Sequence, residues 1–74
     1  MNMKTYLVNL YEVKNGVWSL YTSYAIYGDK LSDEIHSIVS RGFRLTISNF
    51  FVKTFTFEGC VEHLAYSIVE LPKL

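Results

Sequence analysis

The sequence predicts a small α+β protein, in which one helix packs on a face of an antiparallel sheet. Three patterns support this fold class: a long hairpin over Thr5–Tyr27, an amphipathic helix over Ser32–Arg41, and a second β pattern over Phe43–Phe57. The expected order is β-β-α-β, followed by either a C-terminal helix or a fourth strand. We expect a single domain that spans residues 1–74.

The hairpin is centred on the Asn-Gly pair at 15–16. The runs on either side are rich in β-branched and aromatic residues, and Asn-Gly tolerates the positive φ angles that a type I′ turn needs. A two-residue loop fixes the register. Lys14 should therefore lie opposite Val17, and the pairing should continue without a break to Thr5 and Ile26.

This register sorts the hairpin side chains onto two faces, because side chains alternate along a strand. One face is clearly apolar and is expected to form the main core. Its members are Leu7, Tyr11, Val13, Trp18, Leu20, Tyr24 and Ile26. The second face is mixed, yet it holds more large apolar side chains than a solvated face normally does. We therefore expect part of it to be covered by a second helix, another copy of the chain, or a partner protein.

The helix is predicted from Ser32 to Arg41. Ser32 is suited to the N-cap, and acidic residues follow in the first turn, where the helix dipole favours anions. Gly42 is expected in the left-handed conformation after the last turn, with Phe43 packed back on Ile38. The apolar stripe at helical spacing consists of Leu31, Ile35, Ile38 and Val39.

The rest of the chain is less clearly patterned. Phe43–Phe57 reads as a strand with a bend or bulge near residues 49–51, where the alternation breaks. Apolar residues at helical spacing in Cys60–Leu71 favour a second helix, which would cover the second hairpin face. The strand propensity of residues 66–71 supports the alternative, a fourth strand that folds back on residues 52–57.

Composition narrows the functional classes. A chain of 74 residues buries a modest share of its surface, but 50% hydrophobic and 16% aromatic residues compensate, and dimerisation would add to this. Seven basic and seven acidic residues give no net charge, which argues against electrostatic binding to nucleic acid. The single cysteine allows no internal disulfide and fits a cytoplasmic protein. We expect no signal peptide and no membrane span.

No constellation of residues indicates catalysis or metal binding. Cys60 and His63 would share one side of a helix, but structural zinc normally needs four ligands, and the other histidine is the distant His36. A lone cysteine usually behaves as a small buried hydrophobe. The adjacent Asp33 and Glu34 are explained by the helix dipole. We therefore expect no enzymatic activity, no cofactor and no metal site.

Six tyrosines carry the functional hypothesis, because tyrosine combines a large apolar body with a polar tip and is enriched at interfaces. We predict a non-enzymatic protein-binding module that forms a homodimer, in the style of small phage or mobile-element inhibitors. The alternatives are a nucleic-acid-binding domain that stacks bases on strand tyrosines and a small-ligand binder at a homodimer interface. The predicted partner-binding residues are Tyr6, Leu10, Tyr21 and Tyr27.

Overall fold

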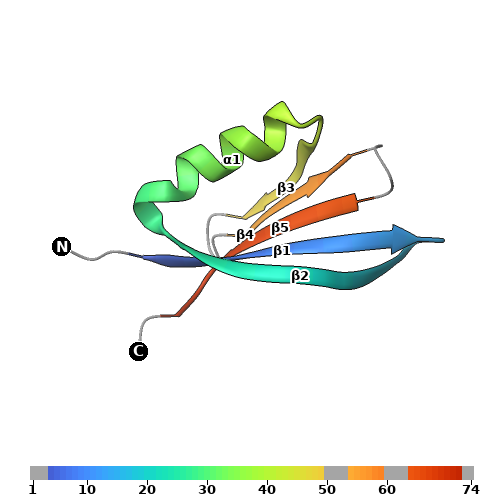
Figure 1. The fold of residues 1–74 in the computed structure, drawn as a ribbon, viewed down its shortest axis with the longest axis horizontal. Helices are drawn as coiled ribbons and strands as arrows, with labels where there is room; N and C mark the ends of the chain where they lie inside the picture. Colours follow the sequence, from blue (N-terminus) through green and yellow to red (C-terminus); the bar gives the residue numbers. More distant parts are fainter. Residues whose placement is uncertain (1–3, 50–53, 60–63, 73–74) are drawn as a thin grey trace.

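A five-stranded antiparallel sheet and one α-helix form the part of the chain that the computed structural model describes, residues 4–49, 54–59 and 64–72. The strand order is β2-β1-β5-β4-β3, and α1 crosses one face of the sheet (Figure 1). The elements are β1 (Thr5–Lys14), β2 (Val17–Tyr27), the 3-10 turn η1 (Gly28–Lys30), α1 (Leu31–Ser40), β3 (Arg44–Asn49), β4 (Thr54–Glu58) and β5 (Leu64–Glu70).

The predicted hairpin turn is confirmed. Asn15 and Gly16 have φ angles of 53° and 77°, as a type I′ turn requires. From this turn, β1 and β2 pair as expected as far as Tyr11 and Leu20. The local chemistry of the Asn-Gly pair is therefore sufficient to start the hairpin in the correct register.

The predicted register is wrong beyond Leu20, because β2 contains a bulge. Tyr11 lies opposite Leu20, whereas the next residue of β1, Leu10, lies opposite Thr22. Tyr21 is thus the extra residue, and every later pair is displaced by one position. Thr5 therefore lies opposite Tyr27 instead of Ile26.

The displaced register also corrects the assignment of faces. Tyr6 and Val8, which the sequence placed on the second face, are buried in the core together with the helix residue Ile38. The bulge brings Tyr24 opposite Val8 and Ile26 opposite Tyr6, so these two β2 residues join the same core face. The remaining residues of the predicted core face lie on the other side of the sheet. They are Leu7, Tyr11, Val13, Trp18 and Leu20.

The helix lies close to its predicted position but begins differently. It covers Leu31–Ser40 and follows η1 directly, with Lys30 as N-cap and no side-chain cap hydrogen bond, so the prediction of Ser32 as the N-cap is wrong. Its end is as expected. Gly42 has a φ of 100°, its N–H donates to the Val39 carbonyl at 3.1 Å, and Phe43 packs in the core cluster that contains Ile38.

The C-terminal helix favoured by the sequence is wrong. Residues 64–70 form β5, which pairs antiparallel with β1 on one side and β4 on the other. The region predicted as one strand, Phe43–Phe57, forms two strands, β3 and β4, and the expected bend at residues 49–51 lies mostly outside the described residues. The fold is thus dominated by its sheet. A helix at residues 64–70 would leave the inner edges of β1 and β4 without backbone partners, at a cost in free energy for each buried polar group.

The core lies between α1 and the sheet. One large side chain from each of β1, α1, β4 and β5 has no solvent exposure, and such burial contributes about 1.5–3 kcal/mol per side chain. These four are Val8, Ile38, Phe57 and Ile68. Arg41 anchors the end of α1 to the sheet, because its guanidinium Nη1 donates to the Tyr66 hydroxyl at 2.9 Å.

Candidate protein-interaction surface

The sheet face opposite α1, here called the open face, is covered by no described helix or strand (Figure 1). Side chains from β1 and β2 form an apolar patch on it, because Val13 lies opposite Trp18 and Tyr11 lies opposite Leu20. We define the open-face patch as Leu7, Tyr11, Val13, Trp18 and Leu20. These residues alternate with core residues along β1, and they follow the predicted register on β2.

The centre of the open-face patch is held in place by its neighbours. The rings of Tyr11 and Trp18 are 5.4 Å apart at an angle of 52°, a tilted contact that is favourable for aromatic pairs. Asn9 and Ser67 are both buried at the base of the patch, where Asn9 Nδ2 donates to Ser67 Oγ at 3.3 Å. Ser67 Oγ in turn donates a long bond of 3.5 Å to the Tyr11 hydroxyl. These contacts limit the freedom of the Tyr11 side chain.

The second notable surface is the outer edge of β2. This strand lies at the end of the sheet and, among the described strands, pairs only with β1. Ten of its eleven residues are exposed, and the other is half-buried. Its exposed large apolar side chains are Val17, Trp18, Leu20, Tyr21, Tyr24 and Tyr27.

The four predicted partner-binding residues do not form one surface. Tyr6 is buried in the core at 6% exposure, so it presents almost no area to a partner. Tyr21 and Tyr27 are exposed on β2 at 71% and 63%. Leu10 and Tyr21 meet at an open cleft of about 360 Å³, which Glu12 and Leu64 also line. That volume falls within the range of small-ligand sites, but Glu12, the charged group among its described lining residues, forms an ion pair of 2.9 Å with Lys14.

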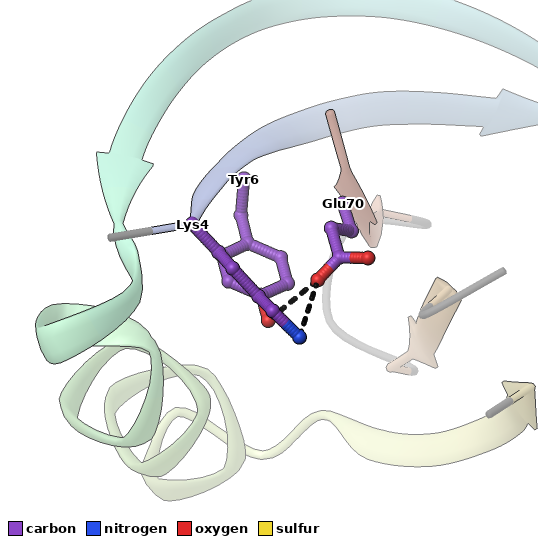
Figure 2. Close-up of polar contacts among 3 residues, drawn as sticks. All are labelled: Lys4, Tyr6 and Glu70. Carbon is purple, nitrogen blue, oxygen red and sulfur yellow. Dashed lines mark hydrogen bonds and ion pairs between the residues drawn. The ribbon is translucent and has the colours of Figure 1, made fainter. Parts of the chain in front are cut away.

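The hydroxyl of the Tyr6 side chain belongs to a polar cluster at the start of β1. Tyr6 Oη donates to Glu70 Oε1 at 3.4 Å, and Lys4 Nζ lies 3.3 Å from the same oxygen (Figure 2). Burial raises the pKa of the Tyr6 hydroxyl, and the Glu70 carboxylate raises it further. A tyrosine that acts as a base or nucleophile needs the opposite shift, so we assign this cluster a structural role in joining β1 to β5.

A second tyrosine joins the sheet to the helix in the same way. The Tyr24 hydroxyl on β2 donates to the Glu34 carboxylate on α1. Burial and then this hydrogen bond to Glu34 raise the pKa of Tyr24 well above its ordinary value. The bulge at Tyr21 makes this contact possible, because it turns Tyr24 to the side of the sheet that faces α1.

Metal chemistry finds no support in the described residues, among which no three histidine, cysteine, aspartate or glutamate side chains are grouped closely enough to hold an ion. Cys60 and His63, weighed above as a ligand pair, lie outside the described residues, and His36 is exposed on α1. The one α-helix of the described chain is also too short and too polar to cross a bilayer.

No protein-family model, curated protein or solved structure matches this chain. The open-face patch and the β2 edge are therefore the features from which a function can be argued.

The sequence missed Trp18 and Leu20 as surface residues. The alternation of apolar residues predicted that one face of the hairpin is apolar, but it did not determine which face α1 covers. One available signal was the complete lack of charged residues in Val17–Tyr27, since the exposed edge of a sheet is usually protected by charge.

Proposed function

We propose that this chain is a protein-binding module and that the open-face patch is its contact surface. The observation that carries the proposal is the exposure of Trp18 and Leu20, at 41% and 60%, beside Tyr11 and Val13 on a sheet face that no described element covers. Contiguous apolar side chains on a small protein commonly mark an interface.

The chemistry of the patch suits a protein partner. Tryptophan and tyrosine are enriched among the residues that dominate binding energy, because they bury a large area while ordering few rotatable bonds. Tyr11 is already oriented by its ring contact with Trp18 and by Ser67, so binding costs less side-chain entropy. The patch contains no charged residue, so desolvation of the surface on binding is inexpensive.

Affinity capture from a lysate of the encoding organism, read by quantitative mass spectrometry, tests this proposal. Trp18→Ser and Leu20→Ser should each reduce recovery of the partner about tenfold or more, as expected for residues near the centre of an interface. The matched control is Val39→Ser, which removes a similar apolar group that is 48% exposed on α1. Equal recovery by all three variants would place the binding surface elsewhere.

Once a partner has been identified, the fluorescence of the single tryptophan, Trp18, tests whether this residue lies in the contact. Trp18 fluorescence should shift to shorter wavelength on titration, because the partner replaces water around the indole. An unchanged spectrum in a saturated complex would exclude Trp18 from the interface.

A further inference from the structure

We propose that two copies of this chain associate through the outer edges of their β2 strands and so form one continuous antiparallel sheet. The inference concerns the edge of the sheet and does not depend on the open-face patch as the site for another protein. It assigns a second copy of the chain as the occupant of this edge.

The outer edge of β2 is long and accessible. The strand has eleven residues, and on the side away from β1 no described strand pairs with it. A strand in this position presents a row of backbone N–H and C=O groups that can pair with another chain.

β2 lacks most of the features by which proteins protect such an edge. Its sequence, VWSLYTSYAIY, contains no lysine, arginine, aspartate, glutamate, proline or glycine. The opposite edge strand, β3, has six residues, begins with Arg44 and is interrupted by its own register shift. Of the two edges, β2 is therefore the one suited to pairing.

The bulge at Tyr21 determines which part of β2 forms the contact. A bulge increases the local twist and interrupts a regular ladder. The run from Thr22 to Tyr27 lies beyond it and pairs with β1 in an unbroken register. We assign this run as the centre of the contact between the two copies.

A second copy fits this edge by symmetry. A two-fold axis perpendicular to the sheet makes the two β2 strands antiparallel and places one residue of the run opposite its own symmetry mate. Because the strand is uncharged, self-pairing creates no like-charge contact. The same axis places both helices on one side of the joined sheet and both open faces on the other.

The exposed side chains of β2 supply part of the area that a stable dimer buries. The aromatic residues at and beyond the bulge are exposed at 71% (Tyr21), 40% (Tyr24) and 63% (Tyr27), which at about 150–250 Å² each leaves roughly 250–450 Å² accessible. A typical stable interface buries about 800 Å² per partner. The edge backbone and the smaller exposed side chains of the run add to the aromatic area.

Charge placed at the centre of the run tests the proposal. Ala25 is exposed, small and opposite Leu7 on the open face, so a longer side chain there points into solvent. The wild-type chain should be a dimer by light scattering at high concentration, and its unfolding temperature should rise with concentration. Ala25→Lys and Ala25→Glu should each weaken the dimer about tenfold or more, because like charges then meet across the axis. An equimolar mixture of the two variants should restore association.

The matched control is Ser48→Lys on the other edge strand, which should leave the dimer intact. Far-ultraviolet circular dichroism should confirm that every variant is folded. A wild-type chain that stays monomeric up to about 1 mM would overturn the proposal, as would a dimer that tolerates Ala25→Lys and is broken by Ser48→Lys. Loss of partner capture in Trp18→Ser with normal dimerisation would separate this inference from the proposed function.

Discussion

Single tyrosine hydroxyls hold distant segments of this chain together. Tyr24 donates to Glu34 on the helix, and Tyr6 donates to Glu70 on β5. Burial raises the pKa of both tyrosines, and the carboxylates raise it further. Each hydroxyl therefore holds its proton more tightly in the folded chain than in the unfolded chain. The fold should consequently become less stable at alkaline pH.

The free energy of unfolding should fall as the pH rises above about 10, the ordinary pKa of tyrosine. Unfolded tyrosines lose protons there while the folded ones retain them, so the stabilisation is complete below this pH and is lost above it. Urea unfolding between about pH 8 and pH 11 measures the slope. Tyr24→Phe should make the free energy of unfolding depend less steeply on pH. Tyr27→Phe, which alters an exposed side chain, is the control and should leave the slope unchanged. An equally steep slope in Tyr24→Phe would contradict the assignment.

Gly59 is required by close packing rather than by an unusual backbone conformation. A Cβ atom at this position would lie 2.8 Å from Cδ1 of the Phe43 ring, which is buried after the helix. Gly59→Ala should therefore lower the free energy of unfolding by about 1–3 kcal/mol, measured by urea denaturation. The same substitution in a Phe43→Leu background should cost less, because the ring is gone. Equal costs in both backgrounds would show that another contact is responsible.

At the scale of elements, the bulge in β2 decides which face of the hairpin meets the helix. The predicted register placed Tyr24 and Ile26 on the same face as Leu7 and Tyr11, which was expected to be the core but is the open face. With the bulge, both lie on the side of the sheet that faces α1, where Ile26 packs against the core and Tyr24 reaches Glu34. Trp18 and Leu20 stay on the open face. One extra residue therefore places Tyr24 and Ile26 on the opposite side of the sheet from Trp18 and Leu20.

Deletion of Tyr21 should be tolerated. The shortened β2 would pair regularly with β1, and Val8 would still lie opposite Tyr24, so the core is unchanged. We expect an unfolding temperature within about 5 °C of the wild type by circular dichroism. Deletion of Leu7 is the contrasting variant. It moves the Tyr6 side chain from the core side of the sheet to the open face, and it should unfold the chain. A Tyr21 deletion that unfolds as readily as the Leu7 deletion would show that the bulge itself is essential.

At the scale of the whole molecule, β5 unites the two halves of the sheet. It lies between the N-terminal hairpin and the β3–β4 pair, and its residues Ala65–Ile68 are all buried. A backbone hydrogen bond from Leu71 N–H to the Thr5 carbonyl joins the two ends of the described chain. Another, from Gly28 N–H to the Lys4 carbonyl, joins the end of β2 to the start of β1. The sheet therefore cannot form fully until the last strand of the chain is in place.

The arrangement of layers explains where further stabilisation would come from. One helix of ten residues covers one face of a five-stranded sheet, and no described helix or strand covers the other face or the β2 edge. A chain of this size gains proportionately more from association than a larger one, since it buries a smaller share of its own surface. The proposed partner contact and the proposed dimer would each cover one of these surfaces.

The sequence by itself determined the hairpin turn, the start of its register, the helix and its glycine end, because short-range contacts and backbone conformation govern these features. Only the tertiary structure decided that residues 64–70 form a strand and that β2 contains a bulge. Both depend on pairing with residues far away in the chain. A central strand whose successive residues are all buried has a sequence much like that of a buried helix. The exposure of Trp18 and Leu20 follows from that long-range pairing, so the open-face patch could be recognised only in the folded chain.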